Sequence, residues 1–218
     1  MATRFYLTSL DNEAPITPAL DSGYWFNTSN SRRLVMSTTR RNSTMTTFND
    51  NNMNASSDQY FGRSQFICPV PLAGGQTLPT SSTFYAVVRA QEEQSTDNAY
   101  LDYNLRILNS SGTERSSNGY TTGTEMSSTA LTARGVTSDT YGTNQSLSAG
   151  DYVCFEVGYD INSTHTDCDF TISFGDDAAS DLTDGSTTAN NPYVEVNFDF
   201  DFQSTGVNNQ LMMVGVGK

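Results

Sequence analysis

The strongest pattern in the chain is an alternation of apolar and polar residues near its C-terminus. In Tyr193–Phe202 (YVEVNFDFDF), valine or phenylalanine occupies every even position, and an acidic residue or asparagine occupies the odd positions from Glu195 on. A period of two places one kind of side chain on each face of an extended strand. The apolar face needs a second apolar layer, so the pattern predicts a β-sandwich with an acidic outer face. The positions expected to face the core are Val194, Val196, Phe198, Phe200 and Phe202.

Eight other segments have the length and composition of short strands. They are Arg33–Ser37, Met45–Phe48, Gln59–Ile67, Thr83–Ala90, Tyr100–Leu108, Thr129–Thr137, Asp151–Gly158 and Phe170–Gly175. Residues that favour turns separate them, such as Ser117-Asn118-Gly119 and Ala149-Gly150-Asp151. No window shows the apolar i, i+3, i+4, i+7 spacing of a helix. The expected fold is therefore all-β, an antiparallel β-sandwich of the jelly-roll kind.

The 218 residues suit one large all-β domain flanked by two peripheral segments. We expect the sandwich to comprise residues 31–202. Residues 1–30 contain Pro15, Pro18 and Trp25 without a clear period, which indicates an N-terminal arm or edge strand. Residues 203–218 form a C-terminal tail, and each large apolar side chain there gains about 1.5–3 kcal/mol on burial. The tail should therefore dock on its own domain or on a neighbouring subunit through Leu211, Met212, Met213, Val214 and Val216.

The net charge is −13 and is unevenly distributed. The first 134 residues carry ten arginines against eleven carboxylates, whereas thirteen carboxylates lie between Arg134 and Lys218. A surface of this sign repels phosphates, so we expect neither nucleic acid nor a membrane as a partner. The first fifteen residues lack the apolar stretch of a secretory signal, and no segment has the length of a membrane span.

Candidate catalytic groups are few. The three cysteines form no CxxC motif, which indicates free thiols in a reducing cytosol rather than a disulfide framework or a zinc site. The single histidine, His165, lies three residues before Cys168. Cys168 shares its parity with Phe170 and Ile172, which favours a core position over the role of a nucleophile. We therefore expect no enzymatic activity and no obligatory cofactor.

One acidic loop is a candidate cation site. Four carboxylates lie within nine residues, at Asp176, Asp177, Asp181 and Asp184. Such a loop supplies the oxygen ligands that Ca²⁺ prefers, although the spacing differs from that of an EF-hand. The alternative is a solvated acidic loop without a metal, which is the commoner outcome.

A set of aromatic residues suggests a second kind of site. If these rings shared one surface, they would form a platform on which sugars stack; if not, they pack in the core or at strand edges. The candidates are Tyr24, Trp25, Tyr60, Phe61, Tyr141 and Tyr159.

Five short stretches together resemble a family of virion structural proteins of tailed phages and of phage-like metagenomic genomes. They are Arg4–Leu7, Pro15–Asp21 before Trp25, Leu147–Val153 leading to Glu156–Gly158, Gly175–Asp177 leading to Ser180–Leu182, and Asn191–Glu195. The matched stretches extend over most of the chain. The sequence departs from the family pattern at Tyr193, where tryptophan is expected, and in the long tail after Phe202. The family carries no catalytic residue that can be transferred.

The resemblance implies a virion protein that is made in the host cytoplasm. The modest length and the absence of fibre repeats favour a capsid decoration (cement) protein on the head exterior. Its partners would be the major capsid protein and sister copies in a homo-oligomer. The apolar tail and the N-terminal residues Phe5, Tyr6 and Leu7 are the expected assembly contacts. The alternative is a glycan-binding or receptor-binding module of the phage tail, because sandwich folds serve both roles.

Overall fold

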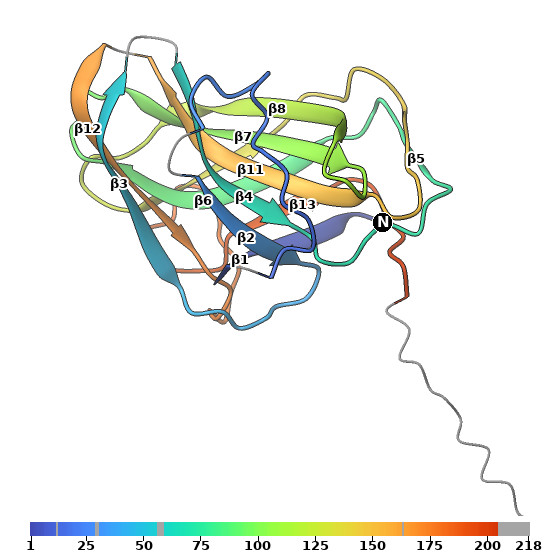
Figure 1. The fold of residues 1–218 in the computed structure, drawn as a ribbon. Coiled ribbons are helices and arrows are strands. Elements are labelled where there is room, and N and C mark those ends of the chain that lie inside the picture. Colours follow the sequence, from blue (N-terminus) through green and yellow to red (C-terminus); the bar gives the residue numbers. More distant parts are fainter. Residues whose placement is uncertain (12, 29–30, 56–58, 163, 205–218) are drawn as a thin grey trace, which may run out of the picture.

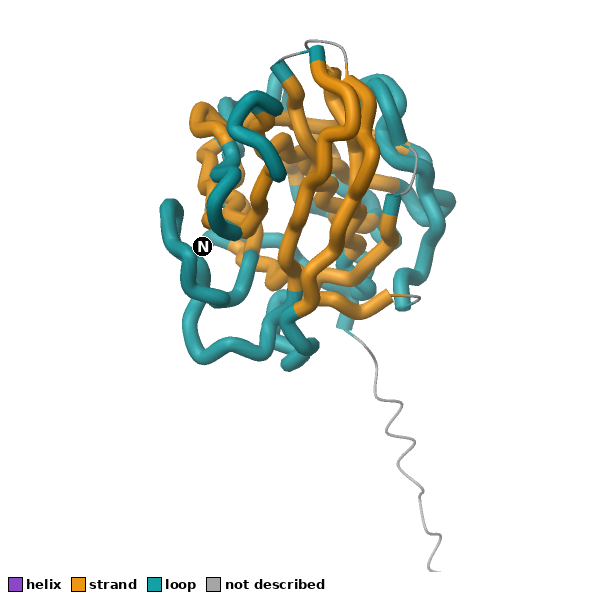
Figure 2. Tube along the Cα trace, turned by 90° about the vertical axis from the view of Figure 1, so that its left-hand side faces the viewer, coloured by secondary structure: helices purple, strands orange, loops and turns teal. Residues whose placement is uncertain are grey.

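The computed structural model describes residues 1–11, 13–28, 31–55, 59–162 and 164–204. These residues form strands connected by turns and loops, and they contain no helix (Figures 1 and 2). Consequently, the described part of the chain has no helix long and apolar enough to cross a membrane. The strands are β1 (Thr3–Asp11), β2 (Arg32–Ser37), β3 (Thr46–Ala55), β4 (Gln59–Ile67), β5 (Thr77–Leu78), β6 (Phe84–Glu92), β7 (Ala99–Leu108), β8 (Glu114–Glu125), β9 (Thr132–Thr137), β10 (Gln145–Ser146), β11 (Tyr152–Ile161), β12 (His165–Phe174) and β13 (Tyr193–Val196).

Eleven of these strands form one large, strongly curved sheet. Its order is β3-β12-β6-β13-β1-β2-β4-β11-β7-β8, with β9 paired to β6 away from this path. β2 and β4 run parallel, and the other neighbours in the sheet run antiparallel. β9 pairs with one edge of β6. On the other edge, β13 pairs with the first half of β6 and β12 pairs with the second half. β5 and β10 form a separate two-stranded sheet.

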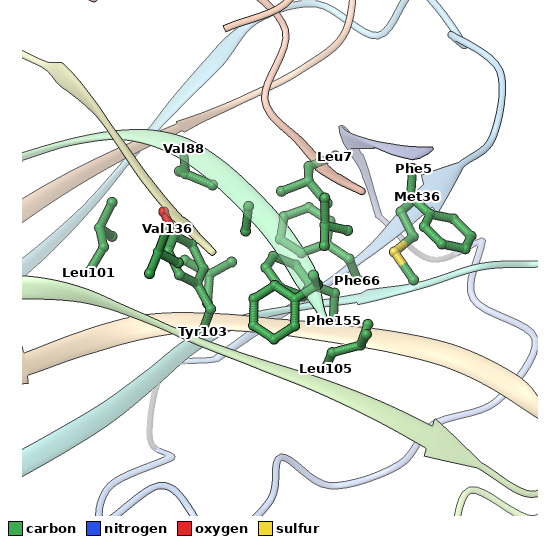
Figure 3. Packing of buried hydrophobic residues seen from close by; sticks show 14 of the residues in the cluster. Phe5, Leu7, Met36, Phe66, Val88, Leu101, Tyr103, Leu105, Val136 and Phe155 are labelled. Atoms are coloured by element: carbon green, nitrogen blue, oxygen red, sulfur yellow. The ribbon is translucent and has the colours of Figure 1, made fainter. Parts of the chain in front are cut away.

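The curvature folds this sheet into a sandwich, which confirms the predicted fold class. β4, β11, β7 and β8 make one layer, and β12, β6, β13 and β1 make the other (Figure 1). Aromatic rings meet between the layers: Phe84 lies 5.8 Å from Phe155, and Phe66 lies 4.7 Å from Phe174, measured between ring centroids. Figure 3 shows how side chains from both layers fill this space, with Phe5 and Leu7 of β1 on one side and Leu105 of β7 on the other.

The predicted strand Tyr193–Phe202 is shorter than expected. β13 ends at Val196, and the chain bends at Asn197 and Phe198. At this end the Asn197 side-chain oxygen accepts a hydrogen bond from the Thr83 backbone N–H at 2.7 Å, and the Asn197 backbone N–H donates to the Thr83 carbonyl at 3.1 Å. The alternation still selects the inward side chains: Val194, Val196 and Phe200 are buried, and Phe198 and Phe202 pack against the core from partly buried positions.

Two strands differ from the expectation more strongly. β1 is an interior strand that pairs with β13 and β2, whereas an arm or edge strand was expected there. Its burial depends on neighbours far away in the chain, which local periodicity does not reveal. β8 includes Ser117, Asn118 and Gly119, which were expected to form a turn. This strand tolerates polar residues because the sheet order ends there and its ladder partner is β7 alone.

Candidate functional site

Two irregular segments cover the outer faces of the sandwich. We call residues 13–28 the N-terminal strap and residues 175–191 the C-terminal strap. In Figure 1 the blue segment preceding β2, which contains the N-terminal strap, crosses the layer formed by β4, β11 and β7. Each strap covers a small apolar island. Ala14 and Ile16 pack on an island made of Ile67, Leu108 and Cys154. Leu182 belongs to the opposite island, with Val87, Ala133 and Tyr193.

Glycines provide the seat for the N-terminal strap. A Cβ atom on Gly62 would lie 2.8 Å from Cγ of Trp25, and one on Gly158 would lie 2.7 Å from the same indole. A Cβ on Gly119 would collide with the ring of Tyr24. The glycines come from β4, β11 and β8, so the strap lies across the whole layer. Trp25 is almost fully buried as a result.

A buried carboxylate fixes the indole in this seat. Glu156 of β11 is fully buried. Its oxygens accept hydrogen bonds from Trp25 Nε1 at 2.7 Å, Gln65 Nε2 at 3.0 Å, Asn104 Nδ2 at 3.3 Å, Arg106 Nη1 at 2.5 Å and the backbone N–H of Asp21 at 3.3 Å. Burial raises the pKa of Glu156, and the Arg106 charge acts in the opposite direction. The guanidinium also donates to the Ala19 carbonyl at 2.9 Å, so it ties the strap to the sheet.

A second buried carboxylate lies on the same face. Asp102 of β7 is fully buried, and its Oδ1 accepts hydrogen bonds from the Tyr24 hydroxyl at 2.6 Å and the Tyr103 backbone N–H at 2.9 Å. Its Oδ2 has no hydrogen-bond partner among the described residues. Burial raises the pKa of Asp102 to about 7, and the nearby Asp160 adds to this effect.

The C-terminal strap is anchored by a more exposed cluster. Arg4 Nη1 donates to Asp181 at 2.7 Å, and Arg4 Nε donates to Glu195 at 2.8 Å. The guanidinium lies 4.1 Å from the ring centroid of Tyr193. About a third of the Arg4 side chain and a quarter of the Asp181 side chain remain exposed to solvent. Arg40 reinforces this end by donating to the Ala178 carbonyl at 2.6 Å.

The four carboxylates of the expected calcium loop point to separate protein donors. Asp176 is fully buried and accepts hydrogen bonds from the backbone N–H groups of Ser43 and Arg41. Oδ1 of Asp177 accepts from the Met45 N–H at 3.2 Å, and Oδ1 of Asp184 accepts from the Gly135 N–H at 2.8 Å. Asp181 is the partner of Arg4. The described residues contain no group of three or more His, Cys, Asp or Glu side chains arranged to hold a metal ion. Calcium binding in this loop therefore stays a prediction.

The expected assembly contacts are only partly available at the surface. Phe5 and Leu7 are fully buried in the core, because β1 is an interior strand. They cannot contact a neighbouring subunit as the sequence predicted. Tyr6 points to the opposite face, where it packs partly buried against the island under the C-terminal strap. The tail residues Leu211, Met212, Met213, Val214 and Val216 lie outside the described residues.

The aromatic residues proposed as a sugar platform do not share an exposed surface. Trp25, Phe61, Tyr141 and Tyr159 are buried. Tyr24 and Tyr60 are half-buried, with ring centroids 6.1 Å apart. The expected core position of Cys168 is confirmed, and all three cysteines are free and buried. Burial raises the pKa of the Cys168 thiol to about 12, which disfavours the thiolate that a nucleophile requires.

The stretches that carry the family resemblance meet at the two straps. Arg4 belongs to the first stretch, and it joins Asp181 of the fourth to Glu195 of the fifth. Trp25 follows the second stretch and donates to Glu156 of the third. Segments separated by more than 100 residues thus form the contacts that hold both straps in place.

Sequence reasoning missed the polar network under the N-terminal strap. Glu156, Asn104 and Arg106 occupy the outward parity of strands whose other face is core, which is the ordinary pattern of a solvated face. A glycine opposite a glycine in paired strands, as at Gly62 and Gly158, was the available signal, because such a gap marks a close approach by another segment.

No protein-family model matches the chain, and no curated protein matches it. Two similar solved structures are described as infectious bursal disease virus, Gt strain and Gx strain. The first is 10% identical with a TM-score of 0.25, covering 69% of this chain and 35% of that chain. The second is 12% identical with a TM-score of 0.23, covering 71% and 36%. This chain therefore spans about a third of the length of either, and scores this low do not establish a shared fold.

Proposed function

We propose that this chain is a virion structural protein of a tailed phage that decorates the exterior of the head shell. It would bind the major capsid protein and sister copies of itself, and its role would be structural rather than catalytic. The observation that carries this proposal is the convergence of the family-like stretches on the two straps. The short stretches that carry the resemblance therefore belong to the framework of the fold.

The surface charge is compatible with an exterior position. Asp199 and Asp201, which follow β13, are exposed, and the chain carries a net charge of −13. Like charges on the outside of particles oppose their aggregation. The surfaces that bind neighbouring subunits would then lie on other parts of the chain than this acidic segment.

The tail is the proposed anchor. Phe5 and Leu7 belong to the core, so they are not available as assembly contacts. Of the assembly contacts that the sequence predicts, the apolar residues of segment 205–218 are therefore the proposed anchor. Deleting residues 205–218 should leave the sandwich folded, since its paired strands and the aromatic contacts between its layers lie before residue 205. The truncated protein should lose oligomerisation or retention on capsids. Full occupancy of capsids by the truncated protein would contradict this role.

The copy number per virion tests the proposal as a whole. A decoration protein covers the shell, so quantitative mass spectrometry of purified virions should find hundreds of copies. A handful of copies would instead support a receptor-binding or glycan-binding position on the tail. Absence from purified virions would contradict the virion assignment itself.

A further inference from the structure

Asp102 lies in an unusual position for a carboxylate. It is fully buried beneath the N-terminal strap, and its Oδ2 has no hydrogen-bond partner among the described residues. Oδ1 of Asn104, the next outward residue on β7, also lacks a partner. The Asn104 amide cannot reverse to correct this, because its Nδ2 donates to the carboxylates of Asp21 and Glu156. Two acceptors on the same face of β7 therefore lack a hydrogen-bond donor, and a proton on Asp102 would provide one at Oδ2.

The charges around Asp102 also favour its protonated form. Asp160 of β11 lies diagonally across from Asp102 in the β7–β11 ladder, since Asp102 is opposite Gly158 and Asp160 is opposite Tyr100. Side chains at diagonal positions on one face are within reach of each other. The titratable or hydrogen-bonding groups that face Asp102 are Tyr24 and Asp21 of the strap, Tyr60 of β4, Asp160 and Glu156 of β11, Thr121 of β8, and Tyr100 and Asn104 of β7.

We propose that Asp102 is a proton-binding site that controls how firmly the N-terminal strap is held. With the proton bound, Asp102 is neutral and Oδ2 can donate to a neighbouring acceptor. When the proton leaves to solvent, a second negative charge remains buried beside Asp160. This inference goes beyond the proposed role in the virion and does not depend on it.

The direction of the pH effect follows from how docking of the strap changes the pKa of Asp102. Docking of the strap removes water from Asp102, which disfavours its charged form, whereas the Tyr24 hydrogen bond favours that form. Burial is the larger of these effects, so the pKa of Asp102 is about 7 in the docked state, above its ordinary value. A group whose pKa is higher in the docked state favours docking when it is protonated. The strap should therefore be tight at acidic pH and looser as the pH rises through neutrality.

The chain contains a natural probe for this change. Trp25 is its single tryptophan, and the indole is buried in the strap seat. The fluorescence emission of Trp25 should shift to longer wavelength between pH 5.5 and 8.5, with a midpoint within about one pH unit of neutrality. Far-ultraviolet circular dichroism should stay constant over this range. A circular dichroism change with the same midpoint would mean global unfolding and would overturn the proposal.

Variants separate Asp102 from other groups. Asp102→Asn keeps the shape but cannot ionise, so its emission should stay at the short wavelength across the range. Glu92→Gln is the matched control. The pKa of Glu92 is also raised to about 7 by burial, but its Oε2 accepts from the Ala99 N–H, outside the strap. This control should keep the wild-type midpoint.

Two results would overturn the proposal: no shift in the wild-type protein, or the same midpoint in Asp102→Asn. If Asp102→Asn does not fold, Asp160→Asn provides the test. Removing the repelling carboxylate lowers the pKa of Asp102, so the midpoint should move to lower pH. An unchanged midpoint in Asp160→Asn would contradict the proposal equally.

Discussion

The two straps solve the same problem with different chemistry. Each covers a small apolar island on an outer face of the sandwich. The N-terminal strap inserts Trp25 between glycines and pairs it with the fully buried Glu156. The C-terminal strap is held by the partly exposed Arg4 cluster and by backbone hydrogen bonds to the sheet, such as that from the Gly185 N–H to the Ala133 carbonyl of β9 at 2.9 Å.

The difference shows what burial of a charge demands. Glu156 is fully buried, and donors from the strap and from two strands, β4 and β7, surround it. Asp181 keeps contact with solvent and interacts mainly with Arg4. Removing one partner from a buried pair leaves an uncompensated charge, whereas water replaces a lost partner at a half-exposed pair. The two straps should therefore respond very differently to equivalent substitutions.

The largest effect is expected for Arg106→Met. This change keeps much of the side-chain length but leaves Glu156 buried without its counter-charge, and we expect a loss of about 3–5 kcal/mol in the free energy of unfolding. Urea denaturation measures it. Because neutralising Glu156 removes the penalty, the loss should be smaller at pH 5 than at pH 8. A loss that is equal at both pH values would mean that packing, not charge, sets the cost.

A smaller loss is expected for Gly62→Ala. The added methyl group would meet Trp25 and Leu20, both in the strap, so the strap has to shift outward. Overpacking of this kind costs about 1–3 kcal/mol. Gly123→Ala on β8 is the matched control, because a Cβ there meets nothing within 4 Å. The thermal melting temperature and Trp25 emission should change in Gly62→Ala and not in the control. Equal behaviour of the two variants would contradict the conclusion that the strap packs tightly against Gly62.

The smallest effect is expected for Arg4→Met at the other strap. It removes the same type of charge from Asp181 and Glu195, which remain hydrated, and we expect a loss of about 0–1 kcal/mol in the same urea experiment. Trp25 emission should not change, because Arg4 contacts the opposite strap. A loss as large as that of Arg106→Met would remove the distinction between the two straps.

The sequence by itself determined most of the strands of this protein and its all-β class. All nine predicted strand segments overlap strands of the structure, because alternation of apolar residues is a local property that burial of one face imposes on each strand. The same parity correctly placed Val194, Val196, Phe200 and Cys168 in the interior. Local patterns did not reveal β1, whose partner β13 lies far away in the chain, or β8, whose residues are mostly polar on both faces at the end of the sheet.

The tertiary structure alone decided what lies on the outer faces. Asp102, Glu156 and Arg106 have the parity of solvated residues, and only the strap that crosses them makes them buried. The four carboxylates of the acidic loop are close in sequence, yet they point to different donors from β1, β9 and residues 41–45. The physical reason is range: strand formation depends on neighbours two residues apart, whereas the state of a charge depends on whatever the fold places over it.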